Sequence, residues 1–109
     1  MNYIIKGIVV HGDGYGKKIG FPTTHLEVKD QVIPKSGVYA GFAILEDKKY
    51  RAGIVIGPGD KIEAHLISYN GDAYGKFVTL EIEKFIREFK KFETEEELIL
   101  QIKKDIDLC

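Results

Sequence analysis

The feature that most constrains the fold is the alternation of apolar and polar residues in FVTLEIEKFI, residues 77–86. Val78, Leu80 and Ile82 alternate there with threonine and glutamate side chains. A period of two residues is typical of a β-strand that buries one of its faces. The segment therefore predicts a strand with a buried side and a polar side.

Four other segments have the short length and the residue types of strands. They are residues 2–10, GVYAGFAIL at 37–45, YRAGIVIG at 50–57 and KIEAHLISY at 61–69. The charged EDKK segment between the second and third of these predicts a hairpin turn, whereas residues 21–34 show no clear period and are expected to be mostly irregular. Five or six short strands predict a small, mainly β, antiparallel barrel, because closure removes the exposed edges of a small sheet.

The C-terminal residues change to the period of a helix. Leu98, Ile102 and Ile106 recur every four residues and form an apolar stripe. Thr94 and Glu97 have the spacing of a capping box, in which each side chain accepts a hydrogen bond from a free backbone N–H. We expect a helix that begins near Thr94 and closes one end of the barrel.

The length and composition limit the classes of protein to which this chain can belong. At 109 residues, with 44% hydrophobic and 30% charged side chains, it is expected to be one globular domain spanning residues 1–109. Sixteen basic and 17 acidic residues give a net charge of −1, which argues against binding of nucleic acid. The single cysteine, the lack of an apolar run of membrane length and the lack of a signal peptide favour a cytoplasmic protein with no membrane contact. Nothing in the pattern requires more than a monomer.

A glycine-rich loop, GDGYGKKIG, follows the first strand. Glycines let backbone N–H groups approach an oxyanion, and Lys17 and Lys18 add positive charge. The loop lacks the spacing of a P-loop, and no helix follows it as in a dinucleotide fingerprint. It is either an anion-binding loop or a flexible connection with solvated lysines.

The GFPTTH segment places hydroxyl groups and an imidazole directly after this loop. Thr23 and Thr24 supply the hydroxyls, and His25 supplies the imidazole. Hydroxyl and phosphate oxygens together can hold Mg²⁺, which takes few protein ligands. The alternative is a simple turn in which Thr23 caps a backbone group.

Three further side chains are candidates for chemistry. Glu63 lies in the middle of a predicted strand between apolar neighbours, where a partly buried carboxylate can act as a general base. His65 shares its face and could orient Glu63 or simply pack, and Arg87 could contact an anionic group. A solvent-facing glutamate and a solvated arginine are the alternatives.

The order of these segments resembles the riboflavin kinase (flavokinase) family, which in many bacteria forms the C-terminal half of a bifunctional FAD synthetase. The most specific stretches are GKKIGFPTTH, IEAHLI and YGKFV, and the resemblance covers nearly the whole chain. The family fold is a six-stranded antiparallel Greek-key barrel with a C-terminal α-helix. The resemblance therefore implies an enzyme that transfers the terminal phosphoryl group of a nucleoside triphosphate, ATP being expected, to the ribityl 5′-hydroxyl of riboflavin.

The resemblance also implies roles for individual residues. Glu63 would be the catalytic base, Arg87 would lie at the flavin site, and Thr23 and His25 would be at the site of Mg²⁺ or another divalent cation. Residues of the nucleotide site would be Gly12, Gly14, Gly16, Lys17 and Thr23. Riboflavin or FMN and ATP or ADP would then be the partners.

The chain departs from the family pattern at two places. His25 stands where the family has an asparagine that helps to bind the metal, and imidazole suits softer ions than Mg²⁺. The VIGPGDK segment before Ile62 is shorter than the corresponding family stretch. These departures motivate an alternative, a catalytically inactive flavin- or nucleotide-binding barrel that serves as a sensor or carrier, whereas the presence of Thr23 and Glu63 argues against it. A barrel that binds nucleic acid through Lys17 and Lys18 is a third possibility, and the net charge disfavours it.

Overall fold

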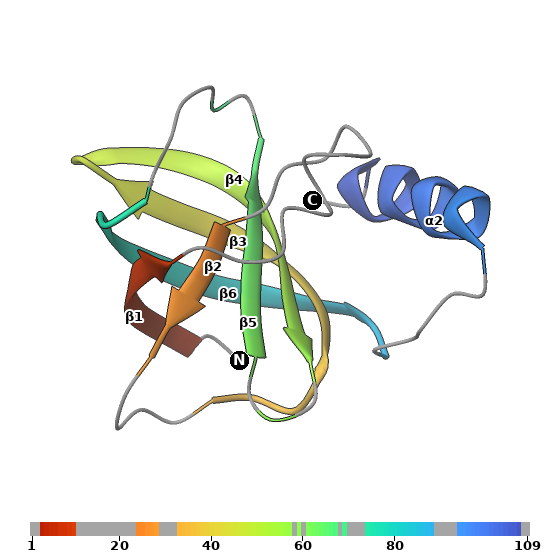
Figure 1. The fold of residues 1–109 in the computed structure, drawn as a ribbon, viewed down its shortest axis with the longest axis horizontal. Helices are drawn as coiled ribbons and strands as arrows, with labels where there is room; N and C mark the ends of the chain where they lie inside the picture. Colours follow the sequence, from red (N-terminus) through yellow and green to blue (C-terminus); the bar gives the residue numbers. More distant parts are fainter. Residues whose placement is uncertain are drawn as a thin grey trace.

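A computed structural model describes residues 3–10, 24–28, 33–57, 59, 61–67, 69, 74–88 and 94–107. In this part of the chain, six antiparallel strands form a closed barrel in the order β1-β2-β5-β4-β3-β6, and one helix, α2, follows (Figure 1). The strands are β1 (Tyr3–Val10), β2 (Thr24–Glu27), β3 (Gly37–Leu45), β4 (Lys48–Gly57), β5 (Lys61–Leu66) and β6 (Phe77–Arg87). The helix α2 spans Glu95–Asp107.

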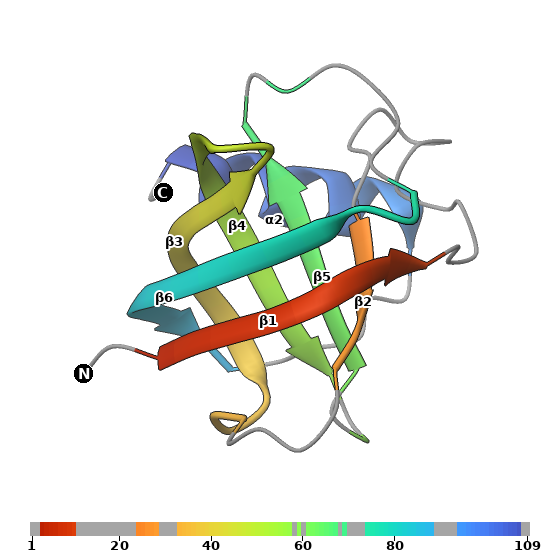
Figure 2. The ribbon, with the colours of Figure 1, turned by 90° about the vertical axis from the view of Figure 1, so that its left-hand side faces the viewer.

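The barrel has Greek-key connections. Strand β4 pairs with β3 on one side and with β5 on the other, and β6 returns to pair with the free side of β3. Strand β1 closes the barrel by pairing with both β6 and β2, and Figure 2 shows β1 and β6 side by side. The predicted mainly β, six-stranded antiparallel Greek-key barrel with a C-terminal helix is thus confirmed.

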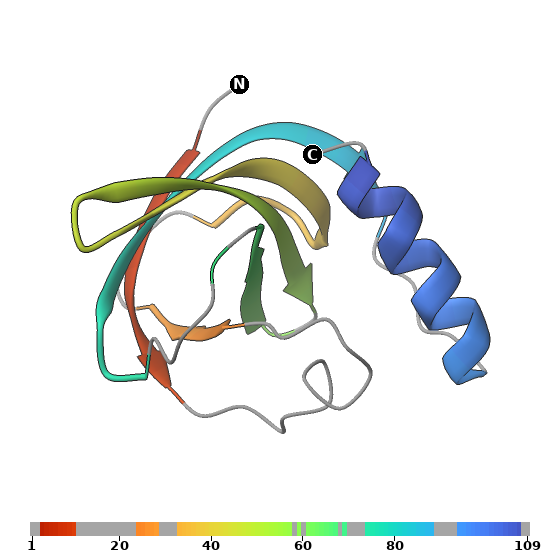
Figure 3. The same cartoon turned by 90° about the horizontal axis from the view of Figure 1, so that it is seen from above.

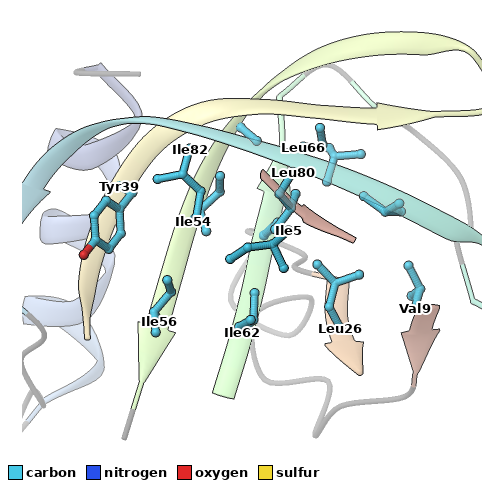
Figure 4. Close-up of a cluster of buried hydrophobic side chains, with 14 of the residues drawn as sticks. Ile5, Val9, Leu26, Tyr39, Ile54, Ile56, Ile62, Leu66, Leu80 and Ile82 are labelled. Atoms are coloured by element: carbon cyan, nitrogen blue, oxygen red, sulfur yellow. The ribbon is translucent and has the colours of Figure 1, made fainter. Parts of the chain in front are cut away.

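The period of two residues in the sequence of β6 corresponds to side chains that point alternately into the barrel and out to its surface. Val78, Leu80 and Ile82 of β6 are at most 1% exposed and point into the barrel, as predicted. Side chains from all six strands fill the interior, and Figure 4 shows ten of them labelled around Ile5 and Ile54. The apolar residues of these strands therefore form one continuous core.

The segment 21–34, expected to be mostly irregular, contains a strand. Residues 24–27 form β2, with Leu26 only 4% exposed inside the barrel. Four residues are too few to show a period, and the strand exists because β1 and β5 supply backbone partners on both sides. This strand positions part of the candidate site.

The β3–β4 hairpin turns at Glu46 and Asp47, and the predicted EDKK turn is shorter than expected. Both residues have positive φ, 52° and 65°, as in the two-residue turns that match the twist of paired strands. Lys48 and Lys49 already belong to β4 and pair with the end of β3.

Gly41 in β3 lies at an irregularity in the pairing of β3 with β6. The register shifts between Ala40 and Gly41, and a Cβ built on Gly41 would come within 1.9 Å of the backbone oxygen of Glu81. Glycine is therefore required sterically, because β6 crosses β3 too closely for a side chain.

Helix α2 lies outside the barrel and follows the end of β6 in the chain (Figures 1 and 3). The Glu97 N–H donates to Thr94 Oγ1 at 3.2 Å, which confirms the hydroxyl half of the predicted capping box. The side chains of Leu98, Ile102 and Ile106 lie outside the described part of the structure. No helix in the described part of the chain is long and apolar enough to cross a membrane.

Candidate functional site

Glu63 lies on the outer face of the barrel, in the middle of β5. Its neighbours Ile62 and Ala64 are fully buried inside the barrel, so the alternation of the strand turns the Glu63 carboxylate outward. The side chain remains 31% exposed, which leaves it partly enclosed and still accessible to a ligand. This is an environment in which a carboxylate can act on a bound substrate.

His25 of β2 lies directly opposite Glu63. The two residues are register partners in the β2–β5 pair, so their side chains share the outer face. His25 Nδ1 lies 3.8 Å from Glu63 Oε1, and the His25 side chain is 24% exposed. The barrel thus brings together two of the residues predicted from the sequence, although 38 positions separate them in the chain.

The polar atoms at this position are close but do not all form hydrogen bonds. A separation of 3.8 Å exceeds hydrogen-bond distance, and His25 Nδ1 is a buried atom with no hydrogen-bond partner among the described residues. Lys61 Nζ lies 3.7 Å from the same Glu63 oxygen, on a side chain that is 52% exposed. One carboxylate oxygen therefore faces an ammonium group and an imidazole nitrogen.

The strand register extends this site across the outer surface of the sheet. Glu63 is paired with Val55 of β4, Val55 with Val38 of β3, and Val38 with Arg87 of β6. We call these residues, together with His25, the outer row. Because neighbouring strands are about 4.8 Å apart, the three steps from Glu63 to Arg87 cover at most about 14 Å. Val38 is only 3% exposed although it points away from the barrel interior.

Arg87, at the far end of the outer row, is engaged by the helix. Its Nη2 lies 2.9 Å from Asp105 Oδ2, and its Nε lies 3.1 Å and 3.3 Å from Oδ1 and Oδ2. Gln101 Nε2 donates to Asp105 Oδ1 at 3.0 Å, and Arg87 Nη1 donates to the Glu88 carbonyl. Arg87 therefore connects the end of β6 to α2, a role that sequence analysis did not find because the contact spans 18 residues.

The other predicted site residues fall elsewhere. His65 is the next outward residue on β5 and pairs with Gly53, so it shares the face of Glu63 as expected. Outside the described residues lie Gly12, Gly14, Gly16, Lys17, Lys18 and Thr23, all predicted for the nucleotide loop or the metal. Thr24, the residue after Thr23, pairs with Ala64 beside Glu63. Within the described segments, no three His, Cys, Asp or Glu side chains form a group that could hold a metal ion.

Curated relatives of this chain are named as riboflavin kinases. The bifunctional riboflavin kinase/FMN adenylyltransferase of Bacillus subtilis is 37% identical over 114 residues, covering 94% of this chain and 36% of the relative. An RNA-binding riboflavin kinase, RibR, of the same organism is 33% identical over 111 residues, covering 94% of this chain and 48% of the relative. The chain thus spans about a third to a half of the length of these relatives.

Two solved structures have the same fold. A Streptococcus pneumoniae chain described as a macrolide-efflux protein superposes with a TM-score of 0.91 and 32% identity, over 96% of this chain and 37% of that one. The crystal structure of riboflavin kinase from Trypanosoma brucei gives a TM-score of 0.75 and 22% identity, over 98% of this chain and 74% of that one. A family model for riboflavin kinase (flavokinase) matches residues 1–109, the full length of the sequence. The chain belongs to the riboflavin kinase family.

Proposed function

We propose that this protein is a riboflavin kinase that transfers the terminal phosphoryl group of ATP to the 5′-hydroxyl of riboflavin, giving FMN and ADP. The observation that carries the proposal is the position of Glu63, a partly exposed carboxylate on the outer wall of the barrel, with His25 directly opposite. Membership of the riboflavin kinase family supports it. A pure binding protein would have no need for a carboxylate held in this way.

Glu63 acts as the general base in this proposal. Its carboxylate takes the proton of the ribityl 5′-hydroxyl while the hydroxyl oxygen forms a bond to the γ-phosphorus of ATP. The bond from that phosphorus to the bridging oxygen of ADP breaks, and ADP leaves with the electron pair. The proton on Glu63 then passes to water. The protein supplies mainly positioning, since phosphoryl transfer needs no covalent intermediate with a side chain.

The outer row offers a course for the flavin. With the ribityl end at Glu63, an elongated ligand would extend over Val55 in the direction of Arg87. Val55 is half-buried and presents apolar surface to a ring system, whereas Val38 is only 3% exposed and contributes little of it. Arg87 would contact the ring or hold α2 beside it. This extent of at most about 14 Å suits a ligand made of a sugar chain and a three-ring system.

The nucleotide would enter from the other side of Glu63. The predicted nucleotide residues Gly12, Gly14, Gly16, Lys17 and Thr23 precede β2, whose first residue, Thr24, pairs with Ala64 on β5. The chain from the glycine-rich loop therefore joins the barrel next to the proposed base. We propose that this loop holds the phosphates of ATP.

Phosphoryl transfer from ATP implies a divalent cation, for which Mg²⁺ is the usual ion. Mg²⁺ prefers an octahedral shell of oxygen atoms. Of the described residues at this site, Glu63 supplies carboxylate oxygens, but His25 supplies a nitrogen where an oxygen ligand is expected. The described residues therefore do not fit Mg²⁺ well, and we assign no step of the reaction to it.

A non-catalytic flavin- or nucleotide-binding barrel is the second candidate, because His25 replaces the family asparagine. RNA binding, which the name of the RibR relative includes, is not proposed for this chain. The net charge of −1 does not favour binding to a phosphate backbone, and this chain covers only 48% of that relative.

The test is the formation of FMN by the purified protein. Incubation with riboflavin, ATP and Mg²⁺, Mn²⁺ or Zn²⁺ is followed by chromatography, and Glu63→Gln is expected to lower turnover by about 10²–10⁴-fold while riboflavin still binds. Glu81→Gln is the matched control, since Glu81 is also on an outer strand face and is 30% exposed. Its turnover should stay within a few-fold of the wild type.

Two results would contradict the proposal in different ways. Wild-type turnover in Glu63→Gln would mean that Glu63 is not the base. Binding of riboflavin without FMN formation under every metal condition would identify the protein as the non-catalytic flavin-binding barrel.

A further inference from the structure

The outer face of β1 and β6 exposes large apolar side chains that the proposed kinase site does not use. Ile4 and Ile8 of β1 are 60% and 43% exposed, and Phe77 of β6, the register partner of Ile8, is 56% exposed. Large apolar side chains that stand together on a surface often mark a place that another molecule covers. We call the outward residues of the two paired strands the β1–β6 face; they are Ile4, Lys6, Ile8, Phe77, Thr79 and Glu81.

The β1–β6 face lies on the opposite side of the barrel from the candidate functional site. In the strand order β1-β2-β5-β4-β3-β6, β6 lies across the barrel from β5, which carries Glu63, and β1 lies across from β4. Figure 2 shows β1 and β6 in front and α2 behind the barrel. A molecule bound to the β1–β6 face would therefore leave Glu63 accessible to its substrates.

The charges on this face have opposite signs on its two strands. Strand β1 contributes the cation Lys6, and β6 contributes the anion Glu81, which lies one outward position away from Thr79, the register partner of Lys6. Glu81 is 30% exposed, and its Oε1 lies 3.2 Å from Lys49 Nζ, so its second oxygen can accept from another cation. A face with both signs suits a second copy of itself, whereas a nucleic acid or an anionic membrane would call for an excess of basic residues.

We propose that two copies of this chain associate through their β1–β6 faces, about a twofold axis that runs parallel to the strands between β1 and β6. The barrel is closed, so a second copy cannot add to it as a further strand and has to pack on a face. This axis places β1 of one copy on β6 of the other. Ile8 then packs against Phe77 of the second copy, and Lys6 lies beside its Glu81. The axis repeats each contact, as an isologous interface requires.

The apolar area of the face is sufficient for a weak dimer. Ile4, Ile8 and Phe77, together with the half-buried Phe42 and Ile44 of the adjoining β3, expose on the order of 350 Å² per copy, which is the size of many functional patches. Two copies would bury about 700 Å² of apolar surface, and homodimer interfaces are about 65% apolar. The whole interface would then measure about 1,100 Å², between a crystal contact and an interface of standard size. Because interfaces of standard size bind with micromolar or higher affinity, we expect this smaller dimer to dissociate in the micromolar range.

The test is sedimentation velocity of the purified protein at micromolar to millimolar concentrations, with a reducing agent that prevents a disulfide through Cys109. The wild type should pass from monomer to dimer as its concentration rises. Ile8→Lys should weaken the dimer at least tenfold, because it places a charge in the apolar centre of the interface. Leu100→Lys is the matched control, since Leu100 is 60% exposed but lies on α2, and its dimer should be as stable as that of the wild type.

Charge reversal identifies the strands that meet. Lys6→Glu and Glu81→Lys each bring like charges together in the proposed dimer, and each change acts twice because the dimer is symmetric. Each variant alone should therefore dimerise at least tenfold more weakly than the wild type. A mixture of the two variants again brings opposite charges together and should form a heterodimer with an affinity close to that of the wild type. Far-ultraviolet circular dichroism of each variant verifies that the barrel is folded.

The outcomes do not depend on the kinase proposal, since no substrate is present. A wild type that stays monomeric at every concentration would leave the face to a different partner and overturn the proposal. A dimer that Ile8→Lys does not weaken would lie on another face and would overturn it as well. A mixture of Lys6→Glu and Glu81→Lys that remains monomeric would contradict the pairing of β1 with β6 across the interface.

Discussion

The ion pair between Arg87 and Asp105 holds α2 to the barrel, and its removal should have a measurable cost. Side-chain exposures of 23% for Arg87 and 11% for Asp105 place this pair between an exposed and a fully buried one. Exposed pairs contribute about 0–1 kcal/mol, whereas breaking a buried pair costs about 3–5 kcal/mol. We therefore expect Arg87→Met to lower the free energy of unfolding by about 2 kcal/mol.

The assay is a double-mutant cycle measured by urea and thermal unfolding. It compares the wild type, Arg87→Met, Asp105→Asn and the double variant. For a domain of about 100 residues each kcal/mol corresponds to about 4–8 °C, so the melting temperature of Arg87→Met should fall by about 10 °C. The coupling energy of the pair should be at least about 1 kcal/mol, because one guanidinium nitrogen bonds to both carboxylate oxygens.

The control is an exposed ion pair on the same strand end. Glu88 lies 3.5 Å from Lys35, and both side chains are more than 60% exposed. Glu88→Gln should therefore cost no more than about 0.5 kcal/mol. If the loss of stability in the double variant equals the sum of the losses in the two single variants to within about 0.5 kcal/mol, the pair is not the anchor of α2.

Riboflavin binding by the same variants separates the two roles of Arg87. If Arg87 acts by holding α2, Arg87→Met and Asp105→Asn should weaken riboflavin binding by similar factors. A loss confined to Arg87→Met would assign the guanidinium itself to the flavin.

Three further changes test the fold. Gly41→Ala should lower the free energy of unfolding, measured with urea, by more than about 3 kcal/mol, because the added Cβ would overlap the backbone oxygen of Glu81. Gly75→Ala is the control: its Cβ would have no neighbour within 4 Å, so only its positive φ should lower the free energy of unfolding, by about 1–2 kcal/mol. Similar losses for both glycines would contradict the steric argument. Burial raises the pKa of the Tyr39 phenol above its ordinary value of 10.0. The neutral phenol therefore contributes fully to the free energy of unfolding below about pH 10, and this contribution is lost as the pH rises through the folded-state pKa. Tyr39→Phe should remove the part of the loss of stability at alkaline pH that comes from this phenol, and should cost about 1 kcal/mol at neutral pH through loss of its hydrogen bond to the Lys35 carbonyl. An unchanged alkaline profile in Tyr39→Phe would contradict it. Thr94→Ala should lower the free energy of unfolding by about 1 kcal/mol, because the helix loses its cap, and circular dichroism should show a shorter helix. An unchanged free energy of unfolding would mean that the cap does not stabilise the protein.

Local patterns were enough for much of the fold. The alternation in β6, the apolar segments of β3 and β4 and the Thr94 cap all depend on neighbours within a few residues, and each was confirmed. Strand β2 was missed, since four residues cannot show a period and its stability comes from two distant strands. The turn between β3 and β4 was predicted, but its length of two residues, Glu46 and Asp47, was not, because it lacks the usual Asn-Gly signal.

For the site, the sequence identified Glu63 as an outward carboxylate and His25 as a departure from the family pattern. It also placed both in a chain that resembles riboflavin kinases, and the family is confirmed. These inferences need only strand period and motif order, which are properties of the linear chain.

Tertiary structure alone decided which of these residues meet. The pairing of His25 with Glu63, and the row that leads through Val55 to Arg87, depend on strand order and register in a closed barrel. The contact of Arg87 with Asp105 likewise depends on where α2 returns to the barrel. Register and closure are set by the packing of the whole core, so no local stretch of sequence contains them.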